Sequence, residues 1–118
     1  MNISLLRKVI SEAIGTAFLV MIVIGSGIMG QNLSTDTLSI LLANTLATGV
    51  GLTTLIWVFI AISGAHFNPA VTLVMLLRRE MTALDAMAYI AAQFLGAMLG
   101  VLIAVSYTHL TLPTTPYV

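Results

Sequence analysis

The chain contains no cysteine and few charged residues, which make up 7% of its 118 positions. Without cysteine it forms neither disulfide bonds nor thiolate metal sites, and two histidines alone make a poor metal centre, so no cofactor is expected. Soluble domains carry about 25% charged residues. With 59% hydrophobic residues and zero net charge, the composition predicts an integral membrane protein and no nucleic-acid partner.

Three apolar runs are long enough to cross a hydrocarbon core of about 30 Å, which takes roughly 20 helical residues. They cover residues 9–30, 38–62 and 83–105. A cleaved signal peptide is the alternative for the first run, but its apolar part exceeds the usual ~7–15 residues and no Ala-x-Ala site follows it. The sequence therefore predicts an all-α protein with three helices that span a lipid bilayer.

A polar decapeptide, Ser-Gly-Ala-His-Phe-Asn-Pro-Ala-Val-Thr at residues 63–72, separates two of these runs. Asparagine is a strong helix N-cap and proline favours the first helical position, so Asn68 and Pro69 are predicted to begin a helix. From Asn68 to Leu77 only about ten apolar residues follow, which rise roughly 15 Å, or half of the hydrocarbon core. Two arginines come next. This pattern predicts a re-entrant half-helix whose N-terminus lies inside the membrane.

The basic residues lie in two pairs, Arg7 with Lys8 and Arg78 with Arg79. The connection between the first two spans, residues 31–37, carries no basic residue. By the positive-inside rule, the N-terminus is predicted to be cytoplasmic and residues 31–37 external. The half-helix then enters from the cytoplasmic side of the cell (inner or plasma) membrane.

Several of these motifs resemble one family. Residues 63–72 resemble the first Asn-Pro-Ala signature of the aquaporins, the major intrinsic protein family. Residues 12–19 (Glu-Ala-Ile-Gly-Thr-Ala-Phe-Leu) and 25–27 (Gly-Ser-Gly) resemble its first helix, and residues 92–97 (Ala-Gln-Phe-Leu-Gly-Ala) its third. The match covers residues 11–104, with the motifs in the expected order, and looks closest to bacterial members.

This resemblance implies an aquaporin-like helical bundle of which the chain holds the first repeat only, three spanning helices plus one re-entrant half-helix. It implies a channel for water or small uncharged solutes such as glycerol, urea or metalloid acids, and a homotetramer for the intact protein. The alternatives are a non-conducting membrane scaffold fragment and a secondary transporter. A transporter should show intramembrane coupling acids beyond Glu12, and the sequence shows none. No nucleophile elbow supports an enzyme.

Asn68 is the central candidate for a pore residue. A half-helix N-terminus presents unsatisfied backbone N–H groups and about half a positive charge, which disfavours cations at that depth. The Asn68 side-chain NH₂ is expected to donate to a passing oxygen, a role that the resemblance implies and that is compatible with capping. Pro69 and Ala70 are expected to fix the helix start and to let two half-helices meet closely.

The non-helical backbone before Asn68 is expected to line the inner pore. Such backbone is tolerated at membrane depth where it lines a cavity, so the carbonyl groups of Gly64, Ala65 and His66 are predicted to form a ladder of acceptors. The resemblance places the His66 side chain on the cytoplasmic side of the pore. Packing alone is the other interpretation of this histidine.

Thr48 is the candidate selectivity residue. It lies slightly external to the midplane of the second span, where the resemblance places a constriction that often carries Phe or Trp. A threonine there implies a wider, more polar filter. The alternative is that Thr48 bonds back to its own helix and faces lipid or protein.

Two polar residues are expected to brace the bundle. The resemblance favours a structural role for Glu12, which accepts hydrogen bonds from the backbone of the re-entrant loop. The alternative is a glutamate in the first helical turn near the interface. Gln93 is expected to be a polar brace between helices. A stripe of small residues in the third span predicts close helix packing and consists of Ala88, Ala92, Gly96, Gly100 and Ala104.

The composition changes after Ala104 to a segment rich in threonine with two prolines. A spanning helix is not expected to carry this composition. Residues 105–110 resemble the translation of a transposon-end adapter used to prepare sequencing libraries. We therefore expect residues 1–104 to form the first repeat and residues 105–118 to be a non-native tail that holds no functional residue. A genuine external loop is the alternative.

Overall fold

The computed structural model describes residues 2–111, and the side chains up to residue 108. The described chain forms helices α1 (Ile3–Leu33), α2 (Thr37–Ser63), α3 (Pro69–Leu77) and α4 (Ala83–Thr111). Helices α1, α2 and the Ala83–Thr108 part of α4 are long and apolar enough to cross a membrane. The predicted all-α architecture of three spanning helices and one short helix is confirmed.

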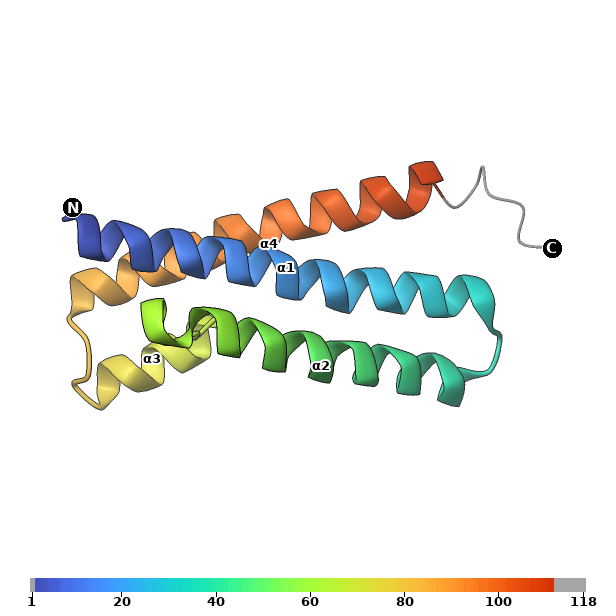
Figure 1. Cartoon of the computed structure of the whole chain (residues 1–118), viewed down its shortest axis with the longest axis horizontal. Coiled ribbons are helices and arrows are strands. Elements are labelled where there is room, and N and C mark those ends of the chain that lie inside the picture. The colour runs from blue at the N-terminus through green and yellow to red at the C-terminus, as the bar shows by residue number, and fades with distance from the viewer. Residues whose placement is uncertain (1, 112–118) are drawn as a thin grey trace.

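The helices form an elongated bundle of 53 × 26 × 19 Å. Helices α1 and α2 run antiparallel along the long axis, and α4 crosses α1 at an angle (Figure 1). Helix α1 packs against both α4 and α2, whereas α3 packs against α4. The short α3 therefore lies in one half of the bundle, at the end where α1 begins (Figure 1).

Local capping explains where α1 and α2 begin and where α2 ends. The Asn2 side chain accepts a hydrogen bond from the Leu5 backbone N–H at 2.7 Å, and Asp36 accepts from Ser39 at 3.1 Å. A second hydrogen bond, from the Ser39 hydroxyl, helps to lower the pKa of the exposed Asp36 carboxyl. Helix α2 ends at Ser63 and is capped by Gly64, whose φ of 87° is the left-handed conformation that glycine adopts at little cost.

The small residues of α4 let it approach α1 closely. A Cβ atom added to Gly96 would meet the Ala13 carbonyl oxygen, and one added to Gly100 would meet that of Ala17. Both glycines are buried. The prediction that this stripe mediates packing is confirmed, because only a residue without a side chain fits against the α1 backbone at these two positions.

The last spanning helix is longer than predicted. The composition change after Ala104 predicts that the helix ends near residue 105, but α4 continues to Thr111. Threonine is tolerated here because the Thr108 hydroxyl donates back to the Ala104 carbonyl at 2.8 Å. The non-native origin of residues 105–118 stays a prediction, and residues 112–118 with both prolines of the tail lie outside the described residues.

Candidate functional site

The loop between α2 and α3 has an unusual backbone. Ala65 and Phe67 have φ angles of 54° and 53°, directly after the left-handed Gly64. Each such non-glycine residue costs roughly 1–2 kcal/mol relative to a right-handed conformation. Two strained residues in so short a segment persist only where surrounding groups hold them.

Glu12 supplies much of that support. Its side chain is fully buried, and Oε2 accepts from the Ser63 hydroxyl at 2.7 Å and from the His66 backbone N–H at 3.1 Å. Oε1 accepts from the Phe67 backbone N–H at 2.8 Å and from Gln93 Nε2 at 2.8 Å. Four donors thus compensate the buried carboxylate, which joins α1 to the loop, to α2 and to α4.

Gln93 extends the network to α3. The same Nε2 group donates to the Thr72 hydroxyl at 2.9 Å, and that hydroxyl lies 2.9 Å from His66 Nδ1. The Thr72 hydroxyl therefore links Gln93 of α4 to His66 of the loop. Thr72 and Gln93 are almost completely buried, so α3 is oriented by polar contacts inside the bundle.

The Phe67 ring anchors the loop on its apolar side. It is 4% exposed and meets Phe59 of α2 edge to face, with ring centroids 5.9 Å apart. A Cβ atom on Gly15 would collide with this ring. Phe67 therefore fills a space on α1 that exists because position 15 has no side chain.

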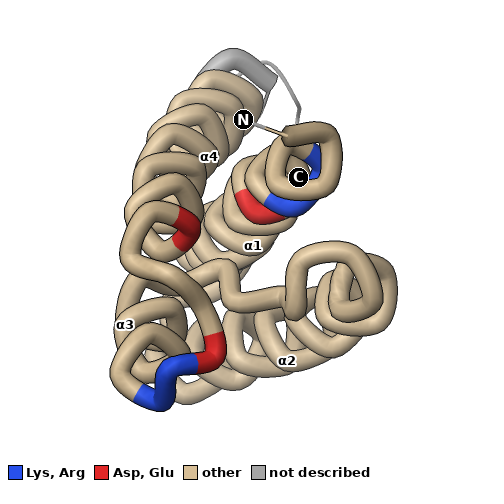
Figure 2. Tube along the Cα trace, turned by 90° about the vertical axis from the view of Figure 1, so that its left-hand side faces the viewer, with Lys and Arg blue, Asp and Glu red and all other residues tan. Residues whose placement is uncertain are grey.

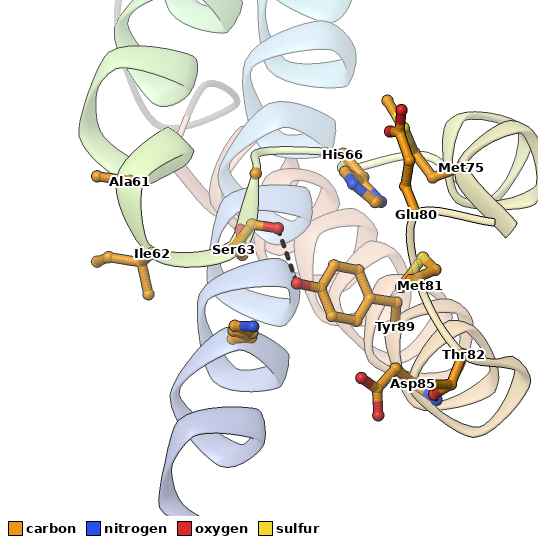
Figure 3. Close-up of a pocket in the computed structure, with 12 residues that line it drawn as sticks. Ala61, Ile62, Ser63, His66, Met75, Glu80, Met81, Thr82, Asp85 and Tyr89 are labelled. Carbon is orange, nitrogen blue, oxygen red and sulfur yellow. Dashed lines mark hydrogen bonds between the residues drawn. The ribbon is translucent and has the colours of Figure 1, made fainter. Parts of the chain in front are cut away.

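Tyr89 ties α4 to the end of α2. Its hydroxyl donates to the Ser63 backbone carbonyl at 2.7 Å, as Figure 3 shows. The Tyr89 ring also contacts the His66 ring, with centroids 5.0 Å apart. The sequence reasoning missed Thr72, Tyr89 and Phe67 as site residues. Phe67 and Thr72 lie within the polar decapeptide and Tyr89 lies within an apolar run, but neither a ring nor a hydroxyl at these positions identifies its partner.

A polar cavity of about 530 Å³ opens beside this loop. His66 and Tyr89 point toward it (Figure 3). Seen from this end of the bundle, charged residues lie on α1, on α4 and in the segment between α3 and α4 (Figure 2). The polar residues of the cavity wall are Lys8, Ser63, Glu80, Thr82 and Asp85, together with His66 and Tyr89. The loop therefore faces an open polar vestibule on the side where α1 begins.

Asn68 lies where the sequence placed it, at the N-cap of α3. Its Oδ1 accepts from the Ala70 backbone N–H at 2.8 Å, and Pro69 occupies the first turn. Asn68 and Ala70 are exposed in this chain and Pro69 is half-buried. In the described part of the chain, Asn68 Nδ2 has no hydrogen-bond acceptor. The cap fixes the amide so that its NH₂ group stays available as a donor.

The carbonyl groups before Asn68 are also available. Those of Gly64, Ala65 and His66 accept no hydrogen bond from any residue that the structure describes. The loop N–H groups, in contrast, bind Glu12 and Ser63. The structure thus brings these three carbonyls and the Asn68 amide together in one short segment with unused hydrogen-bonding capacity.

Thr48 lies apart from this cluster. Asn44, one turn earlier on the same face of α2, donates to the Val23 carbonyl of α1 at 2.8 Å and to the Ser26 hydroxyl at 3.0 Å. Within residues 2–108, the shielded Thr48 hydroxyl has no partner. Unlike Thr53, which bonds back to its own helix, Thr48 therefore retains an unused hydroxyl close to the α1–α2 seam.

Together, the fold and this loop define a class: membrane proteins with several spans in which a capped half-helix enters from one side. The sequence profile described as "Major intrinsic protein" matches residues 1–115. Aquaglyceroporin AqpS of Rhizobium meliloti (strain 1021) is 47% identical over 100 residues, which are 85% of this chain and 43% of that protein. The chain belongs to the major intrinsic protein family, as its motifs predicted.

Two further relatives extend the comparison. Glycerol uptake facilitator protein-like 6 of Lactiplantibacillus plantarum is 40% identical over 93 residues, covering 79% of this chain and 40% of the relative. Lens fiber major intrinsic protein of Rattus norvegicus is 38% identical over 102 residues, covering 86% of this chain and 37% of the relative. The chain thus spans less than half the length of these relatives. Membership in a family of channels supports the expectation that the chain is not an enzyme.

Proposed function

We propose that the chain is the first half of a membrane channel that passes water and small uncharged solutes down their gradients. The observation that carries this proposal is the Asn68 donor beside three carbonyl groups, all without a hydrogen-bond partner among the described residues and held in one fixed segment. Such a row of donors and acceptors replaces the hydration of a neutral solute as it moves. Because these groups are already oriented, no free energy is spent on reorienting them as the solute passes.

Charge exclusion follows from the same geometry. Helix α3 begins at Pro69, so its positive dipole end lies at the level of Asn68. A cation there meets partial positive charge in a low-dielectric surrounding, which opposes its passage. Since the dipole belongs to the backbone, we expect cations to be excluded whatever the width of the filter.

The transporter alternative finds little support in the structure. Glu12 is the one acidic residue that is fully buried among the described residues, and its two oxygens already accept four hydrogen bonds. A coupling acid must exchange protons or bind a cation during the cycle, which these donors oppose. Glu12 is better suited to a fixed structural role.

The solute range and the setting belong to the same proposal. One relative is named an aquaglyceroporin and another a glycerol uptake facilitator-like protein. With threonine at position 48, we propose that glycerol, urea and metalloid acids pass as well as water. We further propose that the intact protein is a homotetramer in the cell (inner or plasma) membrane, with its N-terminus in the cytoplasm.

A chimera tests the function. Replacing the matched region of AqpS by residues 1–104 supplies the missing half from a relative that shares 47% identity with this chain. Vesicles that hold the chimera should shrink in hyperosmotic glycerol faster than empty vesicles and then re-swell. Vesicles with residues 1–118 alone should match empty vesicles, because half of a pore leaves polar backbone facing lipid. A folded chimera that passes neither water nor glycerol, while AqpS does, would refute the proposal.

A further inference from the structure

A second polar cavity, of about 220 Å³, lies beside the start of α1 and the end of α2. Ser4, Arg7 and Lys8 form its α1 wall, and their spacing of three and four residues puts them on one helix face. Ala61 and Ile62 of α2 form the other wall. The cavity thus combines two cations and a hydroxyl with an apolar side.

These cations have no anionic partner among the residues that the structure describes. Within residues 2–108, the ion pair that the structure shows joins Arg78 to Glu80, at the far end of α3. No carboxylate oxygen of this described part of the chain lies within ion-pair distance of Arg7 or Lys8. A guanidinium group and an ammonium group together offer eight N–H donors, so the cavity suits an anion with several acceptor oxygens.

The depth of the cavity points to the source of that anion. The apolar run of α1 begins at residue 9, so Arg7 and Lys8 lie at the level of the phospholipid headgroups. Basic pockets between spanning helices at this level are suited to anionic headgroups. Below the cavity, α2 exposes Trp57 (82%) and Val58 (57%), and α1 exposes Ile10 (47%).

We propose that this cavity binds the phosphate headgroup of an anionic phospholipid, with an acyl chain lying along α2 near Trp57. The phosphate oxygens accept from Arg7, Lys8 and Ser4, and the acyl chain covers the exposed apolar surface next to Ile62. A free phosphate ion would use the same donors but leave this apolar surface uncovered. The acyl chain is therefore the part of the ligand that distinguishes a lipid from an ion.

Trp57 provides the measurement, because it is the single tryptophan of the chain. It lies one helical turn before Ala61, about 6 Å further along the axis, within reach of an acyl chain that starts at the cavity. Residues 1–118 are reconstituted in vesicles with brominated phosphatidylglycerol or brominated phosphatidylcholine at equal mole fraction. Bromine quenches tryptophan on contact, so the ratio of the two quenching curves gives the relative affinity.

We expect stronger quenching by phosphatidylglycerol at low salt. Arg7→Gln and Lys8→Gln should each lower the preference about fivefold. Arg7→Lys, which keeps the charge, should retain most of it. The double variant Arg78→Gln/Arg79→Gln is the control, since it removes two positive charges elsewhere, one more than either single variant, and should leave the ratio unchanged. Circular dichroism verifies that every variant keeps the helix content of the unmodified chain.

Three results would overturn the assignment. Equal quenching by both lipids excludes a headgroup preference. An equal loss in the Arg78 and Arg79 control shows attraction to net charge without a site. If inorganic phosphate abolishes the preference more strongly than sodium chloride of the same ionic strength, the cavity binds a free anion and not a lipid.

Discussion

The carboxylate of Glu12 in α1 lies 2.8 Å from the backbone nitrogen of Phe67 in the re-entrant loop. The same carboxylate lies 3.1 Å from the backbone nitrogen of His66. Two consecutive peptide N–H groups therefore bind one buried anion, which offsets the cost of the left-handed conformation of Phe67. The position of Asn68 relative to the first helix depends directly on this contact.

Replacing Glu12 by glutamine should destabilise the loop. Glutamine keeps one acceptor oxygen but turns an NH₂ group toward N–H donors that now lack a partner. Hydrogen bonds to charged groups contribute roughly 1.5–3 kcal/mol each, so we expect a loss of about 3 kcal/mol in the free energy of unfolding. Thermal unfolding in detergent, followed by circular dichroism, measures it. Glu80→Gln, which breaks an exposed ion pair, should cost less than about 1 kcal/mol, and equal losses would contradict our account.

Two glycines make a matched pair for packing. Gly15→Ala places a methyl group against the Phe67 ring, and overpacking of this kind costs typically about 1–3 kcal/mol. Gly49→Ala meets nothing within 4 Å and should gain up to about 1 kcal/mol from helix propensity. Unfolding midpoints should therefore move in opposite directions. A stabilised Gly15→Ala protein would show that Phe67 is not held against α1.

Features encoded locally were predictable from the sequence. The start of α3 depends on Asn68 and Pro69 alone, and its end at Leu77 precedes two arginines, so both bounds followed from neighbouring residues. The apolar runs predicted the three spanning helices, because a helix must contain roughly 20 apolar residues to cross the hydrocarbon core. The end of α4 was misplaced, since threonine satisfies its hydroxyl on its own helix and does not stop it.

Contacts between distant elements were not predictable in the same way. Nothing next to Thr72 indicates that its hydroxyl meets Gln93 and His66, because that contact depends on how α3 packs on α4. Ala65 and Phe67 have positive φ angles although neither is a glycine, so the residue type does not predict this conformation. These angles exist because Glu12 binds the adjoining N–H groups, a relationship that only the folded chain reveals. The pore roles of these residues stay predictions.

Side-specific labelling tests the topology. The chain has no native cysteine, so Ser34→Cys and Arg79→Cys each create a unique thiol. Ser34 caps the C-terminal end of α1, and Arg79 follows α3 at the opposite end of the bundle. In intact cells, an impermeant maleimide should label position 34 from outside, while position 79 should react only after lysis. Labelling of both thiols from one side would rule out the proposed re-entrant path.

Asn68→Asp in the AqpS chimera tests the donor. Aspartate keeps the oxygen that accepts from Ala70 but removes the NH₂ group and adds a negative charge at the dipole end. Water permeability should fall several-fold and cation leak should rise, measured by light scattering and by ion flux in the same vesicles. Asn32→Asp, at the exposed end of α1, is the control and should change neither. Unchanged water flux with intact cation exclusion in Asn68→Asp would show that the pore does not use this side chain.

The filter prediction concerns Thr48. The resemblance places Thr48 at a constriction, and its buried hydroxyl has no partner within residues 2–108, so we expect Thr48→Phe in the chimera to narrow the passage. Glycerol and urea uptake should drop strongly, whereas water flux should drop much less, because water needs only single-file width. Thr53→Phe, on the same helix but at an exposed position, is the matched control and should leave both fluxes unchanged. Equal losses of water and glycerol in Thr48→Phe would indicate a packing defect. An unchanged ratio of glycerol flux to water flux would show that Thr48 does not lie at the constriction.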